Sequence, residues 1–255
     1  MENTYRDGQF VWRELMTRDM AKARAFYAEL LGWTSEEMAM PTGPYVIFKK
    51  GDQMVAGGMA APADYQGPAA WLGYVSIPDV DAALRATAEN GGNVVMPAMD
   101  VAGVGRFAVI ADPTGGVVGF HRGESGDGPA PGMPGAGTFC WETLNTTDMD
   151  RAKAFYTKVV GWSGGSGPGN VLVFVAGSAQ VADVEPAPPG VPSHWLSHVV
   201  VDGKLEAARD KAEKLGAGVL VPVIDVPTIG RMCIITDPTG AAISLFEPGP
   251  PPAAS

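Results

Sequence analysis

Residues 10–33, FVWRELMTRDMAKARAFYAELLGW, recur without a gap as residues 139–162, FCWETLNTTDMDRAKAFYTKVVGW, and 12 of the 24 aligned positions are identical. A second stretch, PAMDVAGVGRFAVIADPTG at 97–115, recurs as PVIDVPTIGRMCIITDPTG at 222–240, with ten of 19 positions identical. Self-similarity of this kind is the signature of a repeated structural unit. The chain is therefore interpreted as two copies of one domain.

Each copy begins with the pattern of a strand followed by a helix. Residues 10–16 alternate as a strand does, and Asp19 then stands where a helix N-cap is expected. Phe26 and Leu30 follow at helical spacing, and Gly32 ends the helix. Three short strand runs come next, and the order of a strand, a helix and three strands then returns. Each copy thus reads βαβββ twice, which predicts an α+β chain of four βαβββ modules.

The repeats also indicate the domain boundaries. Residues 1–122 form the first predicted domain and residues 138–248 the second. Between them, GESGDGPAPGMPGAG at 123–137 is rich in Gly and Pro and is predicted to be a linker. Residues 249–255 are predicted to be a frayed tail.

Composition excludes several classes of function. The 255 residues are 46% hydrophobic with a formal net charge of −10 and a pI near 4.7. No cluster of Lys and Arg is present to bind phosphates, so a nucleic-acid partner is not expected. No run of 18 apolar residues occurs, and the N-terminus lacks the apolar core of a signal peptide. We therefore expect a cytoplasmic protein with no membrane partner, in which Cys140 and Cys233 are free thiols.

Two motifs carry a resemblance to a known family. A helix motif, D-x-x-x-A-x-x-F-Y, opens each copy within DMAKARAFYAELLGW and DMDRAKAFYTKVVGW, and a strand–turn motif closes it as GRFAVIADPTG and GRMCIITDPTG. This combination resembles the vicinal oxygen chelate family, which includes glyoxalase I, extradiol dioxygenases and bleomycin-resistance proteins. The resemblance implies two glyoxalase-like domains, in which paired modules curl their strands into half-barrel cups.

The resemblance further implies a metal site in each cup, with His, Glu or Gln ligands at set positions on the strands. Three of the four ligand positions in each copy hold residues that are not the usual donors: Trp12, Leu72 and Gly119 in the first copy, and Trp141, Leu196 and Ser244 in the second. A divalent ion needs about four to six donors in a fitting geometry. We therefore expect no metal cofactor at the usual position.

Side chains two apart on a strand share a face, so the residues near these positions are candidates for the cup lining. They are Trp12, Glu14, Tyr74 and His121 in the first cup, and Trp141, Thr143, His198 and Phe246 in the second. Glu14 and His121 are the catalytic candidates, with Glu14 orienting the imidazole for proton transfer. The alternative is that these two residues form a satisfied pair or lie at the solvated mouth of the cup.

The remaining lining residues are candidates for ligand binding. Trp12 and Trp141 would provide flat, apolar surface with one donor each, which suits a planar organic guest. The alternative is that both indoles plug the cups as core residues. Arg106 and Arg231, repeated in the G-R motif, are expected to form internal salt bridges with Asp112 or Asp237.

Two classes of function follow from these observations. The first is a metal-free binding protein that sequesters or carries a small, planar or aromatic molecule, as bleomycin-resistance members of the family do. The second is an enzyme of the glyoxalase, dioxygenase or antibiotic-biosynthesis hydroxylase type, which would use Glu14 and His121 or a displaced metal site. A third class has both cups filled by Trp and a surface that serves partners. Four modules in one chain can complete two cups, so a monomer suffices, and a homodimer stays open.

Overall fold

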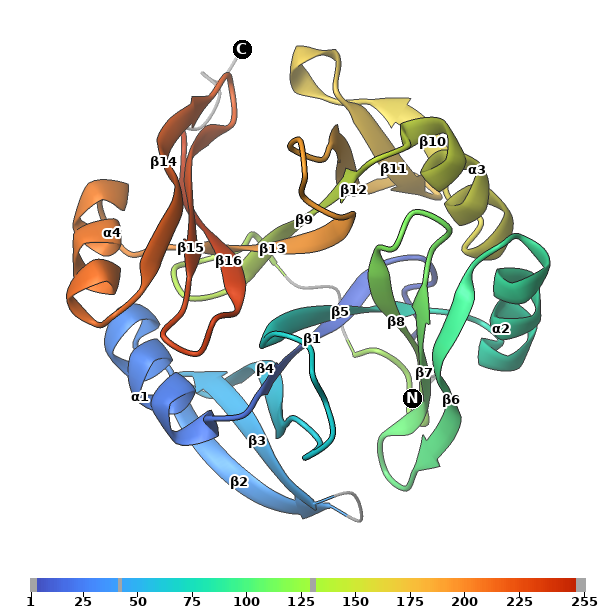
Figure 1. Cartoon of the computed structure of the whole chain (residues 1–255), viewed down its shortest axis with the longest axis horizontal. Helices are drawn as coiled ribbons and strands as arrows, with labels where there is room; N and C mark the ends of the chain where they lie inside the picture. The colour runs from blue at the N-terminus through green and yellow to red at the C-terminus, as the bar shows by residue number, and fades with distance from the viewer. Residues whose placement is uncertain (1–3, 41–42, 129–131, 251–255) are drawn as a thin grey trace. The chain divides into compact units, whose positions relative to one another are not determined.

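The computed structural model describes residues 4–40, 43–128 and 132–250, so part of the predicted linker and the tail from residue 251 onward lie outside the described residues. The order of a strand, a helix and three strands occurs four times along the chain (Figure 1). The first copy consists of β1 (Phe10–Thr17), α1 (Met20–Leu31), β2 (Thr34–Met40), β3 (Gly43–Lys50), β4 (Gln53–Ala60), β5 (Ala70–Ser76), α2 (Val80–Glu89), β6 (Asn93–Val101), β7 (Gly105–Ala111) and β8 (Val117–Gly123).

The second copy repeats this order, with a short 3₁₀ turn added at Pro168–Asn170. It consists of β9 (Phe139–Thr146), α3 (Met149–Val159), β10 (Ser163–Ser166), β11 (Leu172–Ala176), β12 (Ala179–Pro186), β13 (His194–Val200), α4 (Leu205–Lys214), β14 (Gly218–Val226), β15 (Gly230–Thr236) and β16 (Ala242–Pro248). The strands form two eight-stranded sheets with the orders β2-β3-β4-β1-β5-β8-β7-β6 and β10-β11-β12-β9-β13-β16-β15-β14. The predicted α+β fold of four βαβββ modules is confirmed.

The ends of α1 show why the repeated motif folds as it does. The Asp19 side chain accepts a hydrogen bond from the Lys22 amide at 2.9 Å, which satisfies a backbone donor that the helix itself leaves open. At the other end, Gly32 adopts a left-handed conformation with φ of 67°, which glycine reaches at little cost. The predicted start and end of this helix are confirmed.

The four modules pack in an order that differs from their order along the chain. Unit 1 consists of Met1–Trp12, Leu72–Gly132 and Glu142–Leu196, and unit 2 of Arg13–Trp71, Met133–Trp141 and Ser197–Ser255. Unit 1 therefore combines most of the second and third modules, and unit 2 most of the first and fourth. Within unit 1, α2 lies beside α3, and within unit 2, α1 lies beside α4 (Figure 1).

A buried polar cluster joins the two modules of unit 1. The Tyr156 hydroxyl on α3 donates to Oδ2 of Asp112 at 2.9 Å and accepts a hydrogen bond from Trp195 Nε1 at 2.9 Å. The other carboxylate oxygen, Oδ1, accepts hydrogen bonds from the Thr114 amide and hydroxyl and from the next two amides of the D-P-T-G turn. The carboxylate thus organises its own turn and fixes a helix of the other copy of the repeat.

Unit 2 contains the same cluster in its own core. The Tyr27 hydroxyl on α1 donates to Oδ2 of Asp237 at 2.9 Å and accepts from Trp71 Nε1 at 2.8 Å. Burial, reinforced by the Asp237 charge, raises the pKa of Tyr27 well above its ordinary value. The phenol therefore stays protonated and remains a donor to the carboxylate.

Stacked aromatic rings surround both clusters. Trp33 stacks on Tyr27 with ring centroids 5.2 Å apart, and Trp162 stacks on Tyr156 at the same distance. Each indole is nearly fully buried and donates to a backbone carbonyl, that of Gly137 or Gly8, at 2.7 Å. These tryptophans belong to the core.

The prediction for the two repeated arginines is wrong. Arg106 forms ion pairs with Asp81 at 2.8 Å and Asp100 at 2.7 Å. Arg231 likewise pairs with carboxylates of α4, β14 and β16. The aspartates of the two D-P-T-G turns have no room for an arginine, because their oxygens already accept from turn amides and a tyrosine hydroxyl.

Cys140 and Cys233 are not joined by a disulfide, and Cys233 is buried whereas Cys140 is half-buried. None of the helices in the described part of the chain combines the length and the apolar character needed to cross a membrane.

The Tyr–Asp–Trp clusters lead to a stability prediction. Replacing Tyr156 with Phe leaves Oδ2 of Asp112, which is 2% exposed, without a donor. We expect a loss of about 1–3 kcal/mol in the free energy of unfolding, and the same loss for Tyr27→Phe, measured by urea denaturation. Tyr65→Phe is the matched control, because it removes an exposed hydrogen bond to the Pro68 carbonyl. Equal stability of Tyr156→Phe and Tyr65→Phe would contradict the assigned role.

Candidate functional site

The positions where the family places metal ligands are filled differently in this chain. In unit 1, the Tyr74 ring covers Gly119, so a Cβ built on that glycine would lie only 2.2 Å from Tyr74 Cδ1. A carboxylate side chain at residue 119 would collide with this ring, and Trp12 and Leu72 offer no metal donor. The donor set in unit 1 does not fit a divalent ion at this position.

The corresponding residues of the second copy also fail to form a donor set. Ser244 on β16 is fully buried in unit 2, and its hydroxyl oxygen has no hydrogen-bond partner among the described residues. Trp141 and Leu196 carry no carboxylate, imidazole or thiolate. Over residues 4–40, 43–128 and 132–250, no three His, Cys, Asp or Glu residues come together as a potential metal site.

Tyr74 and His121 lie on the same face of the β5–β8 strand pair in unit 1. β5 and β8 run parallel with Tyr74 opposite Gly119 and Ser76 opposite His121, so the side chains of each pair project from the same face. On the other side of β8, Phe107 is the partner of His121, and its ring meets that of Tyr74 edge to face at 6.4 Å. The structure therefore brings together two of the predicted site residues around an aromatic pair.

Asp127 is the carboxylate that acts on His121 within unit 1. Burial lowers the pKa of His121 below its ordinary value, while the Asp127 charge and a hydrogen bond with the Val104 backbone act in the opposite direction. Asp127 Oδ2 accepts from the Ser76 hydroxyl at 2.6 Å and the Arg6 amide at 2.7 Å. A residue of the predicted linker is thus anchored close enough to the imidazole to act on it electrostatically.

Two buried acceptors remain open in this cluster. Among the described residues, Nδ1 of His121 and Oδ1 of Asp127 have no hydrogen-bond partner. A neutral imidazole that donates through its other nitrogen offers a lone pair at Nδ1, so both atoms require a donor. Asp127 is not among the residues predicted from the sequence, although an acidic residue within a Gly- and Pro-rich stretch was the available signal.

Glu14 and Thr143 occupy equivalent positions on their strands, but the acidic residue lies on a different strand in each copy. In unit 2, Glu14 on β1 is the register partner of Gly57 on β4. In unit 1, Thr143 is the partner of Asp183 on β12, and its hydroxyl donates to that carboxylate at 2.5 Å. The carboxylate has moved to the neighbouring strand in the second copy, and sequence reasoning missed Asp183 because strand pairing is not visible in the sequence. The role of Glu14 in orienting His121 stays a prediction.

The remaining predicted site residues lie in unit 2. His198 is buried on β13 as the register partner of Ser244, and Phe246 is half-buried at the next position on the same face of β16. Burial alone lowers the pKa of His198 to about 4, so this imidazole is neutral at physiological pH. Trp141, like Trp12 in unit 1, is half-buried rather than enclosed.

The contact between Tyr74 and Gly119 can be tested by a double-mutant cycle. Gly119→Ala alone must displace the Tyr74 ring and is expected to lower the free energy of unfolding by about 1–3 kcal/mol. Tyr74→Ala removes the obstacle, so adding Gly119→Ala to that variant should cost almost nothing. Additive losses in urea denaturation would show that the ring does not occupy this space.

His198 predicts a pH dependence of stability. Its pKa in the folded protein is about 4, below the ordinary value of 6.5, so the unfolded chain binds the proton more readily between these two values. The contribution of the neutral His198 to the free energy of unfolding is therefore fully present above pH 6.5. It is lost as the pH falls toward 4, by about 3 kcal/mol in total. Urea denaturation across this range should show a smaller slope for His198→Gln than for the His194→Gln control. Protonation of His198 near pH 6.5 in an NMR titration would contradict the assignment.

Comparisons with known proteins agree with this architecture. The chain matches the family model of the Glyoxalase/Bleomycin resistance protein/Dioxygenase superfamily over residues 9–120 and 139–245. It is 36% identical to "Putative glyoxylase CFP32" of Mycobacterium tuberculosis, over 96% of this chain and 97% of the relative. It is 30% identical to "Anthracycline biosynthesis protein DnrV" of Streptomyces peucetius, over 94% and 93% of the two chains.

A solved structure supports the same conclusion about the fold. The Mn(II)-bound glyoxalase from Novosphingobium aromaticivorans superposes with a TM-score of 0.64 at 15% identity, covering 95% of this chain and 82% of that one. Two matched repeats and relatives similar over nearly their whole length leave one conclusion: the chain belongs to the glyoxalase/bleomycin resistance protein/dioxygenase superfamily.

Proposed function

We propose that the chain binds a small, planar or aromatic organic molecule without a metal ion, and that it sequesters or carries this molecule. The observation that carries the proposal is the Tyr74 ring packed over Gly119, where metal-dependent relatives would place a ligand. An aromatic ring has taken the place of a donor, and Trp12 has taken another. A site altered in this way favours stacking over coordination.

The composition of the site supports the same proposal. Pockets for small molecules are mostly apolar and contain a few placed polar groups. In unit 1, Phe107, which packs against the buried Tyr74 ring, and Trp12 are half-buried and supply aromatic surface, and His121 supplies a polar group. In unit 2 the corresponding surface comes from Trp141 and Phe246.

The name of one relative points to a ligand class. DnrV is named for anthracycline biosynthesis, and anthracyclines contain a planar fused-ring system. A guest of this shape matches the flat faces of the half-buried indoles. We therefore propose polycyclic aromatic hydroxy compounds as the first ligands to test.

An enzyme of the same superfamily is the second candidate. It is favoured by the open Nδ1 of His121 and by the burial that lowers the pKa of this imidazole, since a neutral imidazole is able to accept a proton. Glu14 stays a catalytic candidate on the sequence alone, and a displaced metal site is the other source of chemistry. The name of the mycobacterial relative, a glyoxylase, agrees with this class.

Calorimetric titration with 1,8-dihydroxyanthraquinone tests the binding proposal. We expect saturable binding that persists after dialysis against a chelator. Trp12→Ala or Trp141→Ala should weaken it at least about tenfold, because an aromatic pair contributes roughly 0.5–1.5 kcal/mol beyond its buried area. Met133→Ala is the control, because this side chain is 97% exposed.

Native mass spectrometry of protein purified without chelator distinguishes the two candidates. An apo mass, or a mass raised by an organic guest, supports metal-free binding. A stoichiometric Mn, Fe, Ni or Zn adduct would contradict it. Turnover of a glyoxalase or dioxygenase substrate that is lost in His121→Ala would establish the second candidate.

A further inference from the structure

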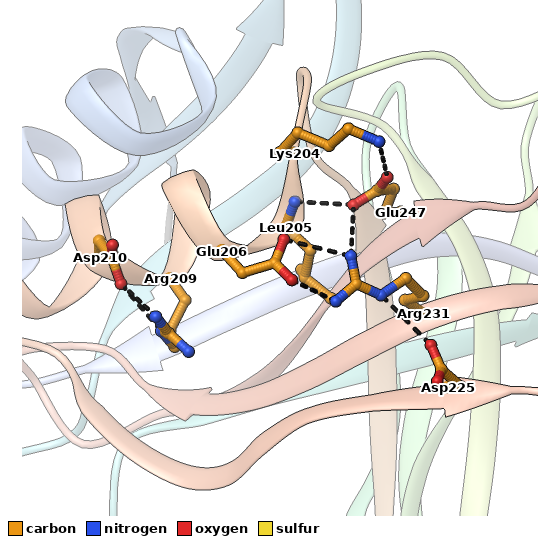
Figure 2. Close-up of polar contacts among 8 residues, drawn as sticks. All are labelled: Lys204, Leu205, Glu206, Arg209, Asp210, Asp225, Arg231 and Glu247. Carbon is orange, nitrogen blue, oxygen red and sulfur yellow. Dashed lines mark hydrogen bonds and ion pairs between the residues drawn. The ribbon is translucent and has the colours of Figure 1, made fainter.

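Arg231 on β15 is the centre of a charged network in unit 2. Figure 2 shows its guanidinium between the carboxylates of Glu206, Asp225 and Glu247. The hydrogen bonds from Arg231 are the main cause that lowers the pKa of Glu206 to about 2. Lys204 adds a second cation at 3.1 Å from Glu247, so three carboxylates face two cations. The network carries a negative excess.

A cavity of about 450 Å³ opens beside this network. Its walls are the turn between β14 and β15 and the chain that follows β16, and its apolar lining consists of Val226, Pro227, Ile229, Pro248 and Pro250. Asp225, Arg231 and Glu247 provide the charged part of the lining. The hollow is shallow and half open to solvent, and its volume lies within the range of small-molecule sites.

Unit 1 contains the equivalent backbone segment of the repeat, 125 residues earlier in the sequence. Arg106 on β7 pairs in register with Arg122 on β8, as Arg231 pairs with Glu247. The Glu124 amide donates to the Val104 carbonyl at 3.1 Å, and the corresponding bond joins Gly249 and Ile229 at 2.8 Å. The two places are therefore directly comparable.

In unit 1 this place is occupied by Tyr5. The Tyr5 hydroxyl donates to the Gly123 carbonyl at 3.1 Å, and the Arg122 guanidinium lies 3.3 Å from the centroid of the ring. Asp7 then pairs with Arg122 at 2.7 Å. The counterparts of the two residues that Tyr5 contacts are Pro248 and Glu247, and both line the cavity of unit 2.

The second copy lacks the residues that fill this place. In the repeat alignment, Tyr5 corresponds to Pro134 and Asp7 to Ala136, so neither the phenol nor the acid recurs. The alignment holds here, because the carbonyls of Gly8 and Gly137 accept equivalent bonds from Trp162 and Trp33. The acceptor for a phenol remains, but the chain does not supply the tyrosine at the repeat position.

We propose that the cavity beside Arg231 binds the phenol ring of a separate small molecule, whose hydroxyl donates to the Pro248 carbonyl as Tyr5 does to that of Gly123. The charge of the site selects among phenols. In unit 2, Glu247 stands at the position that Arg122, the cation beneath the Tyr5 ring, has in unit 1. Arg231 is already paired with carboxylates, so a phenolic amine is preferred over a phenolic acid. This site uses none of the residues of the proposed binding cups and stands independently of them.

Fluorine NMR titration with 3-fluorotyramine tests the proposal. We expect saturable binding of one equivalent, several-fold weaker binding of 3-fluorophenethylamine, which lacks the hydroxyl, and weaker binding still of 3-fluoro-4-hydroxyphenylacetate. Ile229→Trp, at a residue 41% exposed, fills the cavity and should weaken binding more than tenfold. Val104→Trp is the matched control at the equivalent position of unit 1, where the residue is 45% exposed, and should have no effect.

A second variant tests the comparison between the units. Tyr5→Ala removes the ring from unit 1 and leaves Arg122 beneath the vacated place, so a titration of this variant with uncharged 2-fluorophenol should show a second site and a stoichiometry of two equivalents. Binding that is unchanged by Ile229→Trp, or equal for the amine with and without the hydroxyl, would overturn the proposal. A stoichiometry of one for Tyr5→Ala would overturn the premise that a phenol is what this place accepts.

Discussion

A buried tyrosine hydroxyl bonded to an aspartate of the other repeat is the interaction on which this structure depends. In each unit the aspartate of a D-P-T-G turn is almost fully buried, and a helix from the other copy supplies its remaining donor. A buried carboxylate without its donors is costly. Each module therefore needs a module of the other copy to complete its core. The same motifs that reveal the duplication in the sequence hold the two copies together.

The two copies share the same strand pairing, but the side chains at equivalent positions differ. Where the first copy has Gly119 beneath an aromatic ring, the second has a buried serine whose hydroxyl finds no partner among the described residues. Glu14 and Gly57 in one copy correspond to Thr143 and Asp183 in the other. The backbone pairing is retained in both cases, because register is set by the buried faces of the strands. The chemistry offered to a ligand therefore differs between the copies.

Unit 1 contains a cluster in which buried polar groups lack hydrogen-bond partners among the described residues. Buried polar groups usually find hydrogen-bond partners, so an imidazole nitrogen and a carboxylate oxygen left open in one cluster form an exception. The cluster is assembled from distant parts of the chain: Arg6 near the N-terminus, Ser76 and His121 on strands, and Asp127 beyond β8. Such a site is a consequence of folding rather than of any local motif.

The sequence by itself determined the four modules, the helix ends at Asp19 and Gly32, and the loss of the usual donors at the metal-ligand positions. These features are local, since they depend on periodicity, capping and residue identity. Only the tertiary structure decided that the second module packs with the third and the first with the fourth, and that Arg106 and Arg231 pair with strand and helix carboxylates instead of the turn aspartates. It also brought Asp127 to His121 and opened a cavity where Tyr5 has no counterpart. These features depend on which distant segments compete for the same buried donors and acceptors, and a linear pattern does not contain that information.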